Sequence, residues 1–164
     1  MDLESALHQL RTGETAQQAE AAEAIAALGD GAQPAIPALV QFCGDDEESV
    51  RNWCVAALEE AGPPATSHLS DLANMAQAAD SDVAFWAITM LGRAGSEAKD
   101  AIPVLLERLQ DRHAPTVQER AAWALGRIGQ GSEPVIFALE KVASHSGGPL
   151  AAQVQRALKR LKAA

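Results

Sequence analysis

The sequence contains no tyrosine and few other aromatic or β-branched residues. Of its 164 residues only three are tryptophan and three are phenylalanine, although apolar residues make up 48% of the chain, and many of these are alanine. Alanine and leucine favour helices, whereas strands are normally rich in β-branched and aromatic side chains. We therefore expect a nearly all-helical protein, long enough to bury a core without a disulfide or a structural metal.

Long apolar runs and paired metal ligands are also missing. No stretch approaches the roughly 20 apolar residues that a membrane span needs, and the N-terminus does not resemble a signal peptide. Cys43 and Cys54 lack CxxC spacing and the four histidines are scattered, so no zinc signature is present. We interpret both cysteines as small buried apolar residues. The sequence predicts a soluble, cytoplasmic, non-enzymatic protein with no cofactor, metal or membrane contact.

Basic residues are scarce in the first half of the chain. Residues 1–82 hold fifteen Asp and Glu against Arg11 and Arg51, a net charge of −13, whereas residues 83–164 hold seven acids against eleven bases, a net charge of +4. The overall charge of −9 makes nucleic acid an unfavourable partner. We expect mainly a monomer, in which the oppositely charged ends allow weak head-to-tail self-association.

An internal repeat of 33 or 34 residues organises the chain, and such a period indicates a solenoid. The segments that share one pattern start near residues 17, 50, 83, 117 and 150, and they read "QQAEAAEAIAALG", "VRNWCVAALEEAG", "VAFWAITMLGRAG", "VQERAAWALGRIG" and "LAAQVQRALKRLK". The glycine that ends each of the first four is suited to terminate a helix. A second apolar segment follows each of these glycines, with prolines near its start, so each unit is predicted to be two helices.

These segments resemble the HEAT repeat, and more narrowly the short lyase-like (PBS-lyase type) form found in bacteria, whose units read like "VR..AA.ALG.IG" followed by "AIP.L". Here the pattern appears most clearly in "VQERAAWALGRIG" and "DAIPVLLERL", and it extends from about Gln17 to Leu161. The resemblance implies an all-α, right-handed α-solenoid of about five HEAT-like helical hairpin repeats in a single domain, residues 1–164. Residues 1–12 and the basic residues 150–162 are expected to form cap helices.

One departure concerns the arginine that follows the first valine of a family repeat. It survives here only as Arg51, and the matching positions of the other repeats hold Gln or Ala. In the family this arginine ties adjacent repeats to turn aspartates. We therefore expect packing, instead of such a ladder, to hold the repeats together.

The 3.6-residue period of a helix gives the direction of each side chain. In the segment that starts at Val83, Phe85 points away from the apolar stripe and Trp86 lies on one flank. Trp123 points outward in the following repeat. In a solenoid that resembles HEAT proteins these first helices line the concave face. We therefore expect Phe85 and Trp123 to face solvent in a groove, without an intramolecular partner.

The other aromatic residues have a structural interpretation. Trp53 occupies the same repeat position as Trp86, and we interpret both as packing between repeats, with contact to a partner as the alternative. Arg120 occupies this position in the next repeat and is expected to reach water and stack on the Trp86 ring. Phe42 and Phe137 lie on second helices and are expected in the core or in convex-side packing.

Aromatic side chains outside the core stripe, with charges beside them, predict a partner-binding face. The candidate residues are Trp53, Phe85, Trp86, Trp123, Glu59, Glu60, Arg93, Glu119, Arg120 and Arg127. Their charge runs from acidic in the second repeat to basic in the later ones, which would orient a ligand. We predict a non-catalytic scaffold that binds a peptide or helix of a partner protein on its concave face.

Alternative functions stay open. The resemblance also implies a subunit of a chromophore lyase-like enzyme, because the family includes subunits of bilin-attachment lyases, and HEAT-like DNA glycosylases imply a nucleic-acid-binding protein. The acidic residues 44–50 are interpreted as a solvated turn, with an acidic docking site as the alternative. The basic residues 150–162 are interpreted as a helix end that the dipole favours, with contact to nucleic acid or membrane as the alternative.

Overall fold

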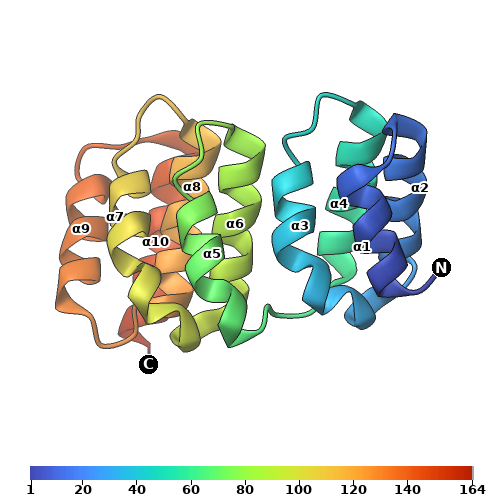
Figure 1. Ribbon diagram of the computed structural model, residues 1–164. Coiled ribbons are helices and arrows are strands. Elements are labelled where there is room, and N and C mark those ends of the chain that lie inside the picture. Colours follow the sequence, from blue (N-terminus) through green and yellow to red (C-terminus); the bar gives the residue numbers. More distant parts are fainter. Residues whose placement is uncertain (164) are drawn as a thin grey trace. The chain divides into compact units, whose positions relative to one another are not determined.

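The computed structural model describes residues 1–163, and these residues contain α-helices and short 3₁₀ segments but no strand. The predicted all-α solenoid fold is confirmed. The chain divides into two compact units, Met1–His68 (unit 1) and Leu69–Ala164 (unit 2). Each unit is a set of helical hairpins, drawn in Figure 1. That the repeats act as one domain stays a prediction.

Unit 1 is built on a packed set of four α-helices. Its elements are α1 (Leu3–Thr12), α2 (Thr15–Ala26), η1 (Gly29–Ala35), α3 (Ile36–Phe42), α4 (Glu48–Glu60) and η2 (Thr66–His68). Helix α2 packs against both α1 and α4, and α3 packs against α4. Leu10, Ile25 and Leu58 are fully buried between these helices. The Asp2 side chain caps α1 by accepting the Ser5 N–H at 2.9 Å, and this bond lowers the pKa of the Asp2 carboxyl.

Unit 2 consists of two layers of helices. Its elements are α5 (Leu69–Met75), α6 (Ser81–Ala94), η3 (Gly95–Ala101), α7 (Ile102–Leu109), α8 (Pro115–Ile128), α9 (Glu133–Ala143) and α10 (Gly148–Lys162). In Figure 1 the layer of α5, α7 and α9 lies in front of the layer of α6, α8 and α10. Helix α8 packs against α6 on one side and α10 on the other, and Leu91, Leu105 and Leu125 are fully buried.

The helix limits follow the repeat pattern closely. The predicted starts at 17, 50, 83, 117 and 150 each fall on the third residue of a helix, from α2 to α10. Asp80 caps α6 by accepting the N–H groups of Asp82 and Val83. Gly29 and Gly95 have φ of 54° and 61°, a left-handed geometry that ends a helix at little cost only for glycine. Local chain chemistry therefore sets where these helices begin and end.

Glutamines occupy two positions where the resembled repeat has arginine, and they join consecutive helices. The Gln18 side-chain amide donates to the Leu10 carbonyl at 3.0 Å, and Gln118 donates to the Leu109 carbonyl at 2.8 Å. Leu10 and Leu109 lie in the last turns of α1 and α7, whose final carbonyls lack helical partners. The expectation that packing alone joins the repeats is therefore incomplete, because side-chain caps contribute. Arg51 instead donates to the backbone carbonyls of Asp45 and Asp46 in its own turn.

Both cysteines lie in the core of unit 1, as the sequence predicts. Burial raises the pKa of the Cys54 thiol to about 12, and the Asp45 carboxylate adds to this shift because a second negative charge disfavours the thiolate. The thiolate is the nucleophilic form of cysteine. Cys54 is therefore chemically inert at neutral pH in the folded protein.

This burial predicts a large difference in reactivity between folded and unfolded protein. In a Cys43→Ala variant at pH 9, Cys54 should react with iodoacetamide at least roughly a hundredfold more slowly than in urea, because the thiolate fraction falls about tenfold per pKa unit and access is blocked. Mass spectrometry of quenched samples measures both rates. Equal alkylation rates in urea and in a protein that remains helical would contradict the burial of Cys54.

Candidate functional site

Five of the predicted aromatic and basic residues of unit 2 form one cluster on α6 and α8. The Phe85 and Trp86 rings meet edge to face, with centroids 5.7 Å apart. The Arg120 guanidinium lies 4.3 Å from the centroid of Phe85 and 5.0 Å from that of Trp123. The Arg127 guanidinium lies 5.1 Å from the Trp123 ring. These five residues form the arginine–aromatic cluster, in which cations stack on ring faces.

The helix period and a glycine explain why the cluster assembles. Arg120, Trp123 and Arg127 are spaced three and four residues apart on α8, so they share one face. That face packs on α6, where a Cβ added at Gly92 would overlap the Trp123 ring. The Arg127 Nε also donates to the Gly92 carbonyl at 2.9 Å. Gly92 therefore lets the indole lie directly against the α6 backbone.

The cluster corrects several sequence predictions. Phe85 and Trp123 are half-buried and have arginine partners, so the expectation that they lack intramolecular partners is wrong. Arg120 stacks on these two rings, whereas the sequence predicts stacking on Trp86. Thr89, which shares the outward repeat position of Trp123, is buried. A helical wheel gives directions on one helix and ignores long side chains that reach across from the next one.

Burial and neighbouring charges both act on the Arg120 guanidinium. The pKa of the Arg120 guanidinium is lowered, first by burial and then by the positive charge of Arg93, whereas Glu119 opposes the shift. Arg93, Glu119 and Arg120 are each half-buried.

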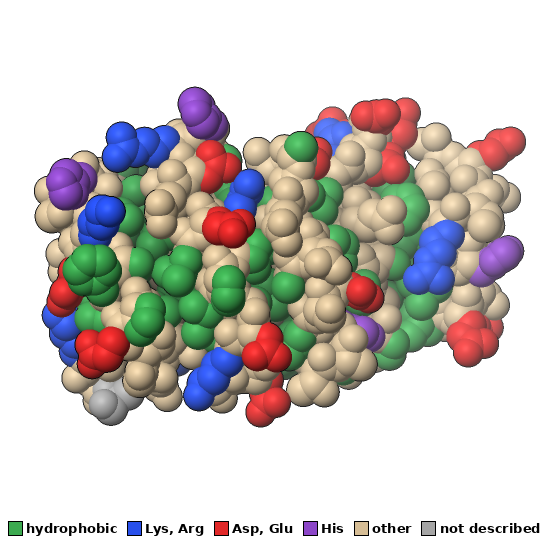
Figure 2. Space-filling view, turned by 60° about the vertical axis from the view of Figure 1, so that its left-hand side comes forward, with side chains coloured by type: hydrophobic (Ala, Val, Ile, Leu, Met, Phe, Trp, Pro, Cys, Tyr) green, Lys and Arg blue, Asp and Glu red, His purple; other side chains and the backbone are tan. Residues whose placement is uncertain are grey.

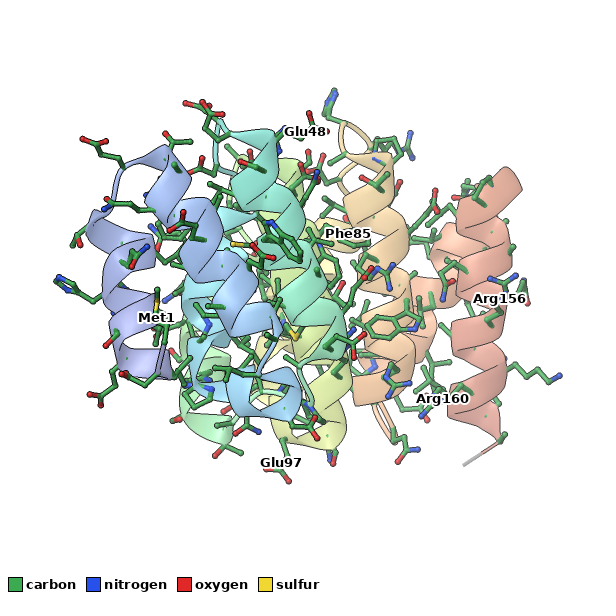
Figure 3. The ribbon with its side chains drawn as sticks, turned by 90° about the vertical axis from the view of Figure 1, so that its right-hand side faces the viewer. Met1, Glu48, Phe85, Glu97, Arg156 and Arg160 are labelled. Carbon is green, nitrogen blue, oxygen red and sulfur yellow. The ribbon has the colours of Figure 1, made fainter. Side chains whose placement is uncertain are left out.

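Two pockets on the α6, α8 and α10 layer share the residues Trp123 and Gln153. The first has a volume of about 150 Å³ and is lined by Phe85, Thr116, Glu119, Arg120, Trp123 and Gln153. The second has a volume of about 370 Å³ and is lined by Trp123, Gly126, Arg127, Gln153, Arg156, Ala157 and Arg160. Figure 3 views this layer, with Phe85 labelled on α6 and Arg156 and Arg160 on α10. The pockets extend the cluster into a continuous polar and aromatic surface.

Sequence reasoning did not include Gln153, Arg156 and Arg160 among the candidate site residues. All three lie on α10, next to α8. A usable signal was present, because Arg156 and Arg160 occupy the repeat positions of Trp123 and Arg127. The sequence interpretation of this basic segment is a helix end that the dipole favours, with contact to nucleic acid or membrane as the alternative.

The remaining candidates lie on α4 in unit 1. Trp53 is 38% exposed, and Glu59 and Glu60 are both exposed. The sequence predicts that Trp53 packs between repeats. In the structure more than a third of its surface is open to solvent. That these three residues contribute to partner binding stays a prediction.

Phe137 on α9 contradicts the expectation that it lies in the core or in convex-side packing, because 69% of its side chain is exposed. It lines a third pocket, of about 400 Å³, on the other layer of unit 2, together with Arg112, Lys141 and His145. Figure 2 shows hydrophobic side chains on this face, bordered by basic and histidine side chains. Phe42, the other second-helix phenylalanine, is half-buried.

Other types of site are not evident in the part of the chain that the structure describes. Residues 1–163 contain no group of three or more His, Cys, Asp or Glu side chains placed to hold a metal ion. In the same range no helix is both long enough and apolar enough to cross a membrane. The arginine–aromatic cluster and its two pockets contain six of the ten predicted partner-binding residues, and they form the candidate site.

The sequence matches the family model for HEAT repeats over residues 3–77 and 69–159. No curated protein matches it significantly. The structure is similar to a designed armadillo repeat protein in complex with the peptide (KR)4, with a TM-score of 0.67, 21% identity, and coverage of 97% of this chain and 81% of that chain. It is also similar to the complex of CpcE and CpcF of phycocyanin lyase from Nostoc sp. PCC7120, with a TM-score of 0.64, 18% identity, and coverage of 94% and 96%. At these identities the structural similarities show the fold.

Proposed function

Because the chain belongs to the HEAT repeat family, as the resemblance of its segments predicts, we propose that it is a non-catalytic interaction module that binds a peptide or helix of a partner protein. The binding face is the α6, α8 and α10 layer of unit 2. The observation that carries this proposal is the pair of pockets that share Trp123 and are flanked by Phe85 and arginines. Aromatic and arginine side chains are the residue types most enriched at energetic centres of interfaces.

The similar structures are consistent with this role. The designed armadillo repeat protein is seen with a bound peptide, and CpcE and CpcF are seen bound to each other. A stack of helical hairpins presents one extended surface built from equivalent positions of successive repeats. In this chain the corresponding positions on α6 and α8 hold the rings and guanidinium groups of the arginine–aromatic cluster.

Partial preorganisation favours binding at this face. Arg120 and Arg127 already stack on Phe85 and Trp123, and Arg127 is held by the Gly92 carbonyl. Side chains fixed before binding lose less conformational entropy when a ligand arrives. The half-buried rings supply apolar contact area, and the guanidinium groups still have free N–H donors for a ligand.

A peptide library displayed on phage tests this function. Peptides selected on the native protein should bind a Phe85→Ala, Trp123→Ala variant roughly 30-fold more weakly, because interface aromatics typically contribute about 2 kcal/mol or more. Titration calorimetry measures the affinities. A Phe137→Ala variant, which removes an exposed ring from the other layer, is the matched control and should bind within about twofold of native.

Circular dichroism establishes that the variants remain folded. If the folded double variant binds every selected peptide as tightly as the native protein, or if selection enriches no peptide, this face is not the binding surface. Arg120→Gln provides a milder second test, since it removes one stacked cation and keeps both rings.

Nucleic acid is a poor partner on electrostatic grounds. The chain carries a net charge of −9, and residues 1–82 carry −13. Affinity for DNA depends on neutralising many phosphates with basic side chains. We expect no retention on a DNA column at 100 mM salt, and strong salt-dependent retention would favour the nucleic-acid alternative.

A further inference from the structure

We propose that the larger of the two pockets that share Trp123, which lies between α8 and α10, binds a carboxylate side chain of the partner peptide. This pocket, called the α8–α10 pocket below, is lined by three guanidinium groups (Arg127, Arg156 and Arg160), the Gln153 amide and the Trp123 ring. The inference rests on the proposed function and specifies the ligand: an acidic peptide in which Asp or Glu stands next to a bulky apolar residue.

No arginine of this pocket forms an ion pair within residues 1–163. Among residues 1–163 the ion pairs are Arg108 with Asp111 and Lys162 with Glu140, and neither involves an arginine of the α8–α10 pocket. Three positive charges around one cavity of about 370 Å³ repel one another. A carboxylate would neutralise part of this charge.

The donor geometry suits a carboxylate. Arg127 uses its Nε to bind the Gly92 carbonyl, so its position is fixed and its terminal N–H groups are left for a ligand. Arg156 and Arg160 are four residues apart on α10 and therefore lie on the same side of that helix. A guanidinium group can bind both oxygens of a carboxylate at once, and Gln153 adds an amide donor.

The surroundings of the pocket define the rest of the ligand. The Trp123 ring forms one wall of the α8–α10 pocket and also lines the neighbouring pocket that contains Phe85. An acidic side chain in the α8–α10 pocket would therefore place an adjacent apolar side chain against Trp123 and Phe85. This pairing distinguishes the proposed ligand from a nucleic acid, whose repeated phosphates would meet the strong negative charge of the whole chain.

A capped synthetic peptide with two Glu-Leu-Phe units joined by glycine is the probe, and titration calorimetry of the full chain is the measurement. An Arg156→Gln, Arg160→Gln variant should bind it at least roughly tenfold more weakly than native. The control is Lys99→Gln, Lys159→Gln, which removes the same net charge from exposed positions outside the pocket and should bind like native. A Lys-Leu-Phe peptide of the same design should not bind.

Equal affinities of the arginine variant and the lysine control would overturn the inference. It would also be overturned if a Gln-Leu-Phe peptide binds only when its C-terminal carboxylate is left free, which would assign the pocket to a chain terminus. Tighter binding of a single-stranded oligonucleotide through the same arginines would assign it to phosphate.

The two proposals can fail separately. If phage-selected peptides depend on Phe85 and Trp123 but are unaffected by the arginine variant, the carboxylate site is wrong and the proposed function stands. If binding of these peptides depends neither on Phe85 and Trp123 nor on the two α10 arginines, the proposed binding face is wrong. Circular dichroism of each variant excludes loss of folding as the cause.

Discussion

Replacing Gly126 with alanine should lower the free energy of unfolding of unit 2 by roughly 2 kcal/mol, although alanine is the better helix former. Gly126 lies inside α8, at its contact with α10. A Cβ at this position would lie 2.7 Å from the Cβ and 2.8 Å from the Cα of Ala157. Because one of these atoms belongs to the backbone, α10 must shift as a whole. The strain of such overpacking exceeds the helix propensity gain of about 1 kcal/mol.

Thermal and urea unfolding followed by circular dichroism measure this effect. Gly147→Ala is the control, because a Cβ there meets no atom within 4 Å, and its stability should change by no more than about 0.5 kcal/mol. Adding Ala157→Gly to the Gly126→Ala variant removes one of the two colliding methyl groups and should restore part of the loss. Gly126→Ala would contradict the close packing of α8 and α10 if it proved stabilising in the native background.

Replacing Gly92 with alanine should change the free energy of unfolding in a direction that depends on whether Trp123 is present. In the native background the new methyl group would overlap the indole, and we expect a loss of roughly 1–3 kcal/mol. In a Trp123→Ala background the overlap disappears, and the same change should stabilise α6 by up to about 1 kcal/mol through helix propensity. The displaced indole should also release Arg127 from the Gly92 carbonyl.

A double-mutant cycle over Gly92 and Trp123, with unfolding free energies from urea titrations, measures this coupling. Tryptophan fluorescence in a Trp53→Phe, Trp86→Phe background reports the displaced indole of Trp123 directly. If Gly92→Ala has the same effect with and without the indole, the ring does not lie against α6 and the arginine–aromatic cluster is misassigned.

The repeat register could be predicted from sequence because its signals are local. Asp80 and the glycines at 29 and 95 set helix ends through their own backbone and side-chain geometry, and apolar spacing sets the buried stripe. Leu58, Leu91 and Leu125 occupy equivalent repeat positions, and all three are fully buried. These properties require only the chain within one hairpin.

The cluster geometry could not be predicted in the same way. The wheel correctly places Phe85 and Trp123 outside the core stripe, but Arg120 is assigned to Trp86 because the two residues share one repeat position. The actual partners are Phe85, across the contact between α6 and α8, and Trp123, three residues along α8. Gly92 looks unremarkable in sequence, yet it allows the indole to approach the α6 backbone.

The exposure of Phe137 and the shared pocket of the α10 arginines could not be predicted from the sequence either. Phe137 has the repeat spacing of a packing residue but is 69% exposed, so the number of neighbours at a position mattered more than its periodicity. Arg156 and Arg160 have a sufficient local explanation in the helix dipole. Only the packing of α10 beside α8 shows that they line a pocket with Arg127.

The sequence by itself determined that this protein is a stack of helical hairpins, where its helices start, and which aliphatic residues are buried, because these depend on spacing within a few helical turns. The tertiary structure alone decided which groups of α6 the arginines of α8 contact and which residues of α8 and α10 share a pocket. Arg120 contacts Phe85, and Arg127 the Gly92 carbonyl, from 35 positions away, and such contacts depend on distances of a few ångströms between helices, which no local pattern encodes.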